Sequence, residues 1–412
     1  MKRIVIVGAG FAGLWSALGA ARKLDEQDIP DTSVEIMVIN PAAYHSIRVR
    51  NYEEPLEQSL VPLSDVLEPA GVAWIEGTVT DIDPGSQHLV AKTRDGIRHL
   101  DYDRMVLAAG SKLAHPPIPG LAEHTFDVDT YAGAKRLGEH LRALPARDDT
   151  PGRYTVVIVG AGLTGVEIAA ELPSRLANIA GNATRDRIRV ILADRTPKIS
   201  QGMGGAQPVI EHAMQVLGVE LLPGVSLKTV DGQGVELADG TRIEAATVIW
   251  CGGMHASELA RQFNVPLDEL GRLPVDEFLR VRGVPSVFAA GDCARLLIDG
   301  DRPSVMSCQH GRPMGRYAGH NVAADLLGLD MLPLQIGWYT TILDLGPWGA
   351  VYTEGWDRHL VAQGEPAKQT KRLINGQRIY PPRRIRHDIL QAAAPVVQAP
   401  PPNYATIEGK IE

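Results

Sequence analysis

The feature that most constrains this chain is a ten-residue pattern that occurs twice, as IVIVGAGFAG (residues 4–13) and as VVIVGAGLTG (residues 156–165). Each copy is typical of a buried strand, a G-x-G-x-x-G turn and the opening of a helix. The glycines permit a tight turn, a close approach of the backbone to a pyrophosphate, and close packing of helix on strand. The free N–H groups at the helix start then favour the phosphate charge. Two copies therefore predict two dinucleotide sites.

The first copy lies in an apolar N-terminal stretch. Hydropathy alone would assign this stretch to an export signal or a membrane span rather than to a strand and a helix. Lys2 and Arg3 precede residues 4–21, which carry no charge and are mostly apolar. Such a stretch is also typical of an export signal or a marginal membrane span. An export signal has no need of glycines at this spacing, and a near copy of the segment recurs in mid-chain. We therefore expect a strand, a phosphate-binding turn and a helix here.

Three further apolar runs end in small residues and indicate the layout of the chain. MVLAAGS (105–111) and VIWCGGM (248–254) close the two units alike, and each follows a stretch with the turn signals of hairpins. The third, SVFAAGDCA (286–294), runs into Asp292. This is where the carboxyl end of a strand would meet a ligand in an open α/β sheet, although a simple Gly-Asp turn is the alternative.

This order predicts an α/β fold with two Rossmann-like dinucleotide-binding domains, each a three-layer ββα arrangement, with the second inserted into the first. A segment rich in Gly, Trp and Tyr predicts a separate, mostly β element, and a Pro-rich tail that orders against a partner follows it. The expected bounds are 1–150 with 275–330 for the first domain, 151–274 for the second, 331–385 for the C-terminal element and 386–412 for the tail.

Charge and cysteine content exclude several classes of protein. The net charge of −8 argues against the broad basic surface of a nucleic-acid binder, so no nucleic-acid partner is expected. Cys251, Cys293 and Cys308 form no CxxC pair, and the chain has no spaced His/Cys set. We therefore expect neither a disulfide framework nor a metal site, and a reducing, cytoplasmic compartment.

One segment departs from the acidic average. Residues 366–387 hold seven Lys and Arg residues and no Asp or Glu. Such a run can dock peripherally on anionic lipid at the inner face of a membrane. The alternative is a solvated face, or pairing with the acidic remainder of the chain, and the sequence leaves both open.

The paired VIVGAG turns, the GVE after the second turn and the FAAGD near residue 290 resemble the two-dinucleotide-binding-domain flavoproteins, most closely their type II NADH dehydrogenase-like branch. The resemblance covers roughly residues 1–380 and implies FAD in the first domain and NAD(P)H in the second. The residues that it assigns to FAD are Gly8, Ala9, Gly10, Phe11, Ala12, Gly13, Asn40, Val79, Ala109, Gly110 and Asp292. Those that it assigns to the nicotinamide cofactor are Gly160, Gly162, Gly165, Asp194 and Gly252.

Two strand-end residues bear on the choice of cofactor. Asn40 stands where the family usually has an acidic residue that holds the adenosine ribose of FAD, so altered FAD binding is expected. Asp194 holds the corresponding place in the second domain. A carboxylate there accepts from the 2′-OH of NADH and repels the 2′-phosphate of NADPH. We therefore expect NADH, with Arg195 beside Asp194 leaving NADPH open.

The resemblance also assigns two catalytic residues. Glu167, expected in the first turn of its helix, matches a glutamate that the family places beside the nicotinamide and the acceptor pocket. The alternative is a carboxylate that the helix dipole stabilises. Gln309 matches the first glutamine of the family's quinone motif, but Pro313 and Met314 replace the later pair. The quinone site is therefore expected to be altered or absent.

The cysteines and histidines near these motifs are not expected to take part in the chemistry. Related disulfide and sulfide reductases need a placed cysteine pair, whereas isolated small cysteines are mostly inert packing residues. Of the three, Cys308 has the best position to touch the flavin region. His45 and His310 are expected to be satisfied polar residues rather than bases.

These observations predict an FAD-dependent, non-proton-pumping NADH dehydrogenase that donates electrons to a quinone or a similar small acceptor. Because the nicotinamide and the flavin carry the redox chemistry, the protein supplies geometry and electrostatics. A reductase for a ferredoxin or rubredoxin is the alternative enzyme. A redox-sensing flavoprotein that resembles the apoptosis-inducing factor group is the alternative outside enzymes. A homodimer is left open.

Overall fold

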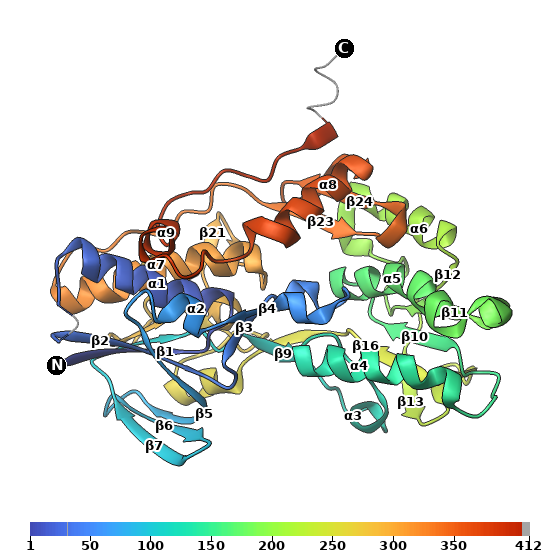
Figure 1. Cartoon of the computed structure of the whole chain (residues 1–412), viewed down its shortest axis with the longest axis horizontal. Coiled ribbons are helices and arrows are strands. Elements are labelled where there is room, and N and C mark those ends of the chain that lie inside the picture. The colour runs from blue at the N-terminus through green and yellow to red at the C-terminus, as the bar shows by residue number, and fades with distance from the viewer. Residues whose placement is uncertain (31, 406–412) are drawn as a thin grey trace.

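The computed structural model describes residues 1–30 and 32–405, apart from the side chains of residues 182 and 183, so the last seven residues of the predicted tail lie outside the described residues. Within these limits, the first unit contains a seven-stranded sheet (Figure 1). Its strands are β1 (Lys2–Val7), β2 (Val34–Asn40), β5 (Ala73–Asp83), β6 (His88–Thr93), β7 (Gly96–Asp101), β8 (Arg104–Leu107) and β19 (Val287–Ala289). They are ordered β19-β8-β1-β2-β5-β6-β7, and the pairs from β19 to β5 are parallel.

The origin of β19 shows how the two units are interleaved. The chain leaves the first sheet after β8, builds the second unit, and returns to pair β19 with β8. The stretch before residues 105–111, in which turn signals predicted hairpins, forms the β5–β6 and β6–β7 hairpins, which turn at Pro84-Gly85 and Asp95-Gly96. The insertion of one α/β unit into the other is therefore confirmed.

The second unit repeats the arrangement on a smaller scale. Its parallel sheet has the order β12-β11-β10-β16, and a three-stranded antiparallel sheet lies beside it. The strands are β10 (Thr155–Val159), β11 (Arg189–Ala193), β12 (Val219–Leu222), β16 (Thr247–Trp250), β13 (Leu227–Asp231), β14 (Gly234–Leu237) and β15 (Arg242–Glu244). Helices of this unit are α4 (Tyr131–Ala143), α5 (Leu163–Ala180) and α6 (Gln207–Val216).

Short elements join and edge the two units. The strand β9 (Ser111–Leu113) of the first unit pairs with β17 (Met254–Ala256) of the second. The other short elements are α2 (Ser64–Leu67), α3 (Leu121–His124), β3 (Tyr44–Ser46), β4 (Leu60–Pro62), β18 (Leu273–Pro274), β20 (Ala294–Arg295), β21 (Leu297–Asp299) and β22 (Arg302–Pro303).

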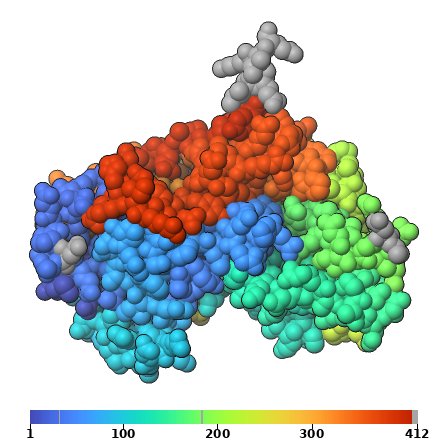
Figure 2. All heavy atoms as spheres, in the orientation of Figure 1, coloured from blue at the N-terminus to red at the C-terminus, as the bar shows by residue number. Residues whose placement is uncertain are grey.

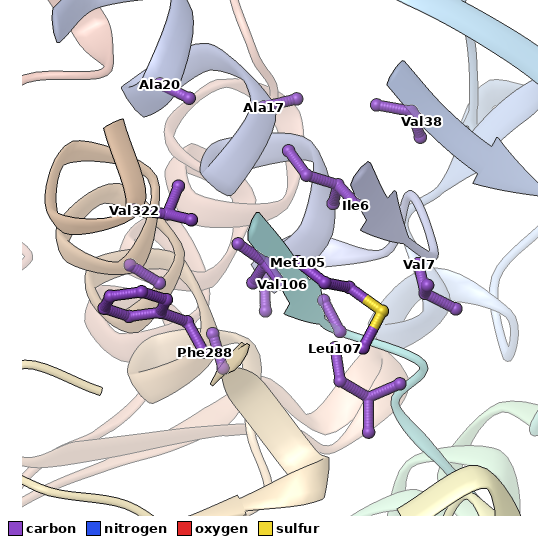
Figure 3. Packing of buried hydrophobic residues seen from close by; sticks show 14 of the residues in the cluster. Ile6, Val7, Ala17, Ala20, Val38, Met105, Val106, Leu107, Phe288 and Val322 are labelled. Atoms are coloured by element: carbon purple, nitrogen blue, oxygen red, sulfur yellow. The ribbon is translucent and has the colours of Figure 1, made fainter. Parts of the chain in front are cut away.

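Two helices from opposite ends of the first unit pack together on its sheet. They are α1 (Phe11–Glu26) and α7 (Cys308–Leu327). Glycines allow the close approach, because a Cβ on Gly315 or Gly319 would overlap backbone atoms of α1. Figure 3 shows Ala17 and Ala20 of α1 and Val322 of α7 in the buried cluster that also contains the sheet residues.

The C-terminal element covers both units. Its strands β23 (Thr340–Asp344), β24 (Ala350–Glu354) and β25 (His359–Gly364) form the expected antiparallel sheet. Helix α8 (Glu365–Leu373) and a π-helical turn over residues 374–378 follow it, so the element contains helix that its composition did not indicate. Figure 2 shows this part of the chain, in orange and red, lying across the first unit in blue and the second in green.

The prediction that the tail orders only against a partner is wrong for its described part. Helix α9 (Arg386–Ala392) packs on α1, and the chain then runs over the C-terminal element (Figure 1). Trp338 Nε1 donates to the Gln398 carbonyl at 2.6 Å, and Thr370 Oγ1 donates to the Pro402 carbonyl at 2.8 Å. Proline-rich backbone offers carbonyl acceptors without competing N–H groups, which is why side-chain donors of the chain's own surface hold it. None of the helices in the described part of the chain has the length and apolar run that a membrane span requires.

Candidate functional site

The two glycine turns impose the same backbone geometry. Gly8 and Gly160, directly after β1 and β10, have φ angles of +99° and +106°, a region that favours glycine. A Cβ on Gly13 would overlap the carbonyl oxygen of Gly8, and a Cβ on Gly165 would overlap that of Gly160. These glycines therefore hold each helix against its own strand.

The middle glycine of each turn leaves open space. A Cβ on Gly10 or Gly162 would meet no atom within 4 Å. Helix α1 begins at Phe11 and α5 begins at Leu163, and no side chain caps either helix. The first N–H groups of both helices are thus available to an anion, as a pyrophosphate requires.

The strand-end residues hold the turns in equivalent ways. Asn40 Oδ1 accepts from the Ala9 N–H at 2.9 Å, and Asp194 Oδ2 accepts from the Ala161 N–H at 2.6 Å. Asn40 Nδ2 also donates to a backbone carbonyl at 2.7 Å. Partial burial raises the pKa of Asp194, but hydrogen bonds from Thr196 and from the Ala161 N–H outweigh it and leave the pKa below its usual value. Asp194 is therefore an ionised acceptor, whereas Asn40 is neutral.

A cavity of about 1150 Å³ runs from the first turn to the start of α5 and along α7. The predicted residues that line it are Gly8, Ala9, Gly10, Phe11, Ala12, Asn40, Val79, Ala109, Gly110, Glu167, Asp292 and Gln309. The predicted residues that do not line it are Gly13, Gly160, Gly162, Gly165, Asp194 and Gly252. The structure therefore brings the residues assigned to FAD, except Gly13, together with both predicted catalytic residues around one cavity.

Asp292 lies three residues after the end of β19, in a short 3-10 turn, and lines this cavity. Its Oδ2 accepts from Ser111 Oγ at 2.6 Å and lies 3.7 Å from Nη1 of Arg48. Arg48 also pairs with Asp129, another cavity residue. Sequence reasoning missed Arg48, Ser111 and Asp129, because nothing in their spacing connects them to Asp292.

Glu167 differs from expectation in position and in what stabilises it. It lies in the second turn of α5, beyond the reach of a first-turn dipole effect. Its Oε1 accepts from Lys371 Nζ at 2.7 Å and from the Asp344 N–H at 3.2 Å. Burial raises the pKa of Glu167 to about 7, against the opposing effect of Lys371. Glu167 can therefore hold or release a proton near neutral pH, at the edge of the cavity.

Gln309 lies in the first turn of α7. Its side-chain amide is oriented so that both its nitrogen and its oxygen form hydrogen bonds. The nitrogen donates to the Thr340 carbonyl at 2.8 Å, and the oxygen accepts from the Thr340 N–H at 3.1 Å. Pro313 lines the cavity, while Met314 is fully buried. The two residues that replace the family's later glutamines thus offer no side-chain hydrogen bond to a quinone.

The three cysteines are free thiols. Burial raises the pKa of Cys251 and that of Cys293 to about 12, and burial also raises the pKa of Cys308. A protonated thiol is a poor nucleophile, so these residues are not placed for a thiol relay. Cys308 lines the cavity, and its contact with the flavin region stays a prediction.

The two histidines are buried and neutral. Burial lowers the pKa of His45 and that of His310 to about 4. His45 Nδ1 lies 2.8 Å from the Ala9 carbonyl, and His310 Nδ1 accepts from the Val305 N–H at 2.8 Å. Within residues 1–30 and 32–405, no three His, Cys, Asp or Glu side chains gather as metal ligands.

The basic segment 366–387 makes contacts within the chain. Six of its seven cations form ion pairs or hydrogen bonds to carbonyls: Lys368, Lys371, Arg372, Arg378, Arg384 and Arg386. Two of these partners, Asp25 and Asp65, belong to the first unit. This favours pairing with the acidic remainder of the chain over a free basic surface.

Comparison with known proteins shows the family of this chain. The class of protein, an NAD(P)H-dependent flavoprotein oxidoreductase, follows from the family match and the relatives. Residues 2–315 match the pyridine nucleotide-disulphide oxidoreductase family, and the chain belongs to this family.

Individual relatives show which members of the family the chain is similar to. The chain is 53% identical over 403 residues to an NADH dehydrogenase-like protein of Mycobacterium tuberculosis, covering 97% of this chain and all of the relative. It is 31% identical to the type II NADH:quinone oxidoreductase Ndh of the same species, over 79% of this chain and 73% of the relative. In fold it is similar to NDH2 from Plasmodium falciparum solved with NADH, with a TM-score of 0.77, 13% identity, and 95% and 97% of the two chains covered.

Proposed function

We propose that this protein is an FAD-dependent NADH dehydrogenase that passes electrons to a quinone-type small acceptor. The observation that carries the proposal is the single cavity that joins the first glycine turn, Asp292, Glu167 and Gln309. A flavin held at the first turn would then share one cavity with an acceptor at the start of α7. The name of the mycobacterial type II relative supports the same reaction.

The residues around the first turn fit FAD. Gly10 leaves the space that a phosphate needs, the uncapped N-terminus of α1 offers N–H groups, and Asp292 can accept hydrogen bonds from hydroxyl groups. Asn40 replaces the usual carboxylate, and its amide retains the ability to bond a ribose hydroxyl. When bound, FAD supplies hydride acceptance from the nicotinamide and electron transfer to the second substrate.

The second turn supports NADH over NADPH. The ionised carboxylate of Asp194, held beside the turn by the Ala161 N–H, would accept from the 2′-OH of NADH and repel a 2′-phosphate. Arg195 is the residue through which NADPH would bind instead.

A residue of the chain itself can hold the proton that quinone reduction consumes. Reduction of a quinone by NADH consumes one proton from solution, because NADH + H⁺ + quinone gives NAD⁺ + quinol. Glu167 is placed to hold that proton, since its pKa is near 7 and it lines the cavity. Lys371 and Asp344 position it, and residues of the C-terminal element line the cavity.

Anaerobic mixing with NADH and then with a panel of acceptors tests the proposal. We expect rapid bleaching of the flavin by NADH, slower bleaching by NADPH, and reoxidation by quinones over many turnovers. Failure of NADH to reduce the flavin would refute it. Slow reduction followed by a persistent charge-transfer band would favour a redox sensor instead.

A second candidate is a reductase for a small electron-transfer protein. Pro313 and Met314 favour it, because they remove the amides that would bind a quinone. A ferredoxin at equal NADH should then reoxidise the flavin faster than any quinone of the panel.

A further inference from the structure

One face of α7 carries two arginines along the cavity. Cys308, Arg312 and Arg316 follow one another at four-residue spacing, which places them on one side of the helix. All three line the cavity. The face therefore extends from the predicted acceptor site at the N-terminus of α7 for two further turns.

These arginines are buried without an anion. Arg316 is 1% exposed and Arg312 is partly buried. The Nε atoms of both, and the indole Nε1 of Trp15, are buried and have no hydrogen-bond partner in the part of the chain that the structure describes. The two guanidinium carbons lie 4.2 Å and 5.3 Å from the centre of the Trp15 ring, for Arg316 and Arg312 respectively. No carboxylate of the described residues forms an ion pair with either arginine.

The charges of Arg312 and Arg316 are not balanced by a carboxylate of the described residues. Burial lowers the pKa of Arg316 to about 9 and that of Arg312 to about 10, so both still carry their charge at neutral pH. A buried charge is normally paired, and an aromatic face compensates for only part of its lost hydration. An anion that accepts hydrogen bonds from these groups would complete the site.

The direction of the Trp15 side chain argues for a site apart from the phosphates of FAD, although a Cβ on Gly311, next to Arg312, would lie 3.9 Å from the Ala12 nitrogen in the first turn of α1. The pyrophosphate belongs at the N-terminus of α1, where Gly13 faces Gly8 and Ala108 on the sheet. Trp15 follows two residues later, about 200° around the helix, and thus projects away from the sheet. The lining of the cavity also includes Ile379, Val396 and Val397 of the C-terminal part of the chain.

We propose that Arg312 and Arg316 form a subsite for an anionic group, a carboxylate or a phosphate, on the electron acceptor. The acceptor of this protein is then an acidic quinone-type molecule whose ring lies near Gln309 and whose anionic group reaches the two guanidinium groups. This inference rests on the proposed function for the redox step. The anionic group takes no part in the chemistry, which remains NADH + H⁺ + quinone to NAD⁺ + quinol.

Equilibrium binding to the oxidised, flavin-loaded protein tests the subsite without turnover. The probes are 1,4-naphthoquinone-2-carboxylate, the matching uncharged carboxamide, and inorganic phosphate as a competitor. We expect the carboxylate to bind at least about tenfold more tightly than the carboxamide, as a charge-assisted hydrogen bond implies. Competition by phosphate would identify a phosphate group as the natural anion, and its absence a carboxylate. Equal affinity for the two quinones would overturn the proposal.

Variants separate an anion site from simple packing. Arg316→Met and Arg312→Met should each remove the preference for the carboxylate and leave the dissociation constant of the carboxamide unchanged. Arg316→Lys should keep part of the preference. Arg136→Met is the matched control, because Arg136 also lies over an aromatic ring, that of Phe126, but outside the cavity. Loss of flavin from the Met variants would show that the arginines hold FAD, and would overturn the proposal.

Flavin reduction by NADH, measured in the same preparations, keeps the two claims apart. If NADH fails to reduce the flavin, the proposed function fails while the binding comparison still decides the subsite. If NADH reduces the flavin and the two quinones bind equally, only the subsite fails.

Discussion

The helices that follow the two glycine turns carry different side chains at the same position. Two residues after the last glycine stands Trp15 in α1 and Glu167 in α5. Both are buried, and each meets cations from the C-terminal half of the chain. Glu167 pairs with Lys371, whereas Trp15 offers only its ring to Arg312 and Arg316. One repeated motif thus gives a paired charge in the second unit and an unmatched positive charge in the first.

The difference shows which part of the motif is fixed. The turn itself is constrained by contacts within each strand–turn–helix unit, so both copies keep the same glycines. The strand-end residue and the second helical turn lie outside those contacts and can diverge, as Asn40 and Asp194 also do. The turn geometry that a dinucleotide requires is common to the two units, and the side chains around it are specific to each.

Replacement of the last glycine tests the shared part and should have the largest effect. Gly13→Ala and Gly165→Ala would each drive a methyl group into the preceding glycine carbonyl, at a cost of more than about 4 kcal/mol in the free energy of unfolding. Gly13→Ala should purify without flavin. Gly165→Ala should lose NADH binding first. Similar losses measured by urea unfolding would confirm that the turns are equivalent, and a fully stable variant of either would break the comparison.

Removal of Lys371 or of Arg316 tests how the two units differ, because Lys371 is paired with a carboxylate and Arg316 is not. Lys371→Met leaves Glu167 buried without its partner and should cost about 3 kcal/mol at pH 8. Because the pKa of Glu167 is raised from 4.5 to about 7 in the folded protein, its ionisation opposes folding, and stability falls as pH rises from about 4.5 to about 7. Loss of Lys371 raises this pKa further, so the variant keeps Glu167 protonated at pH 6. The penalty in Lys371→Met should therefore shrink at pH 6.

Arg316→Met is the counterpart, since it removes a cation that has no anion. It should leave the free energy of unfolding unchanged or raise it at both pH values. Urea unfolding of both variants at pH 6 and pH 8 gives the measurement. Equal destabilisation by the two substitutions would show that Arg316 is merely a packing residue.

The proton on Glu167 gives a third prediction. If the protonated form donates to the reduced acceptor, turnover with quinone should fall as pH rises above about 7. Glu167→Gln should lower turnover by about 100-fold at pH 6 and remove that dependence. Flavin reduction by NADH serves as the control and should change little. An unchanged pH profile in the variant would exclude this role.

The smallest effect is expected at the strand end of the second unit. Asp194→Asn keeps an acceptor for the Ala161 N–H and reproduces the residue found at Asn40. It should raise KM for NADH by about tenfold and change KM for NADPH much less, since only the charge is removed. Steady-state kinetics with both cofactors provide the measurement, and equal changes would refute selection by Asp194.

Much of this architecture could be predicted from local sequence. The two turns, the hairpins at Pro84-Gly85 and Asp95-Gly96, and the return strand before Asp292 each depend on a few neighbouring residues. The cofactor assignments made from the resemblance remain predictions. Prediction failed where the decisive partner is remote: Lys371 is 204 residues from Glu167. It also failed for the tail, whose proline-rich composition is typical of disorder but whose carbonyls meet donors on the chain's own surface.

The sequence by itself determined that this chain builds two dinucleotide-type units, because a glycine required by backbone geometry leaves its signature within ten residues. Only the tertiary structure decided which charges meet. Electrostatic pairing depends on distances between side chains that are far apart along the chain, and burial then sets how strongly each pair matters. That is why the paired Glu167 and the unpaired Arg316 become distinguishable only once α5, α7 and α8 are folded around one cavity.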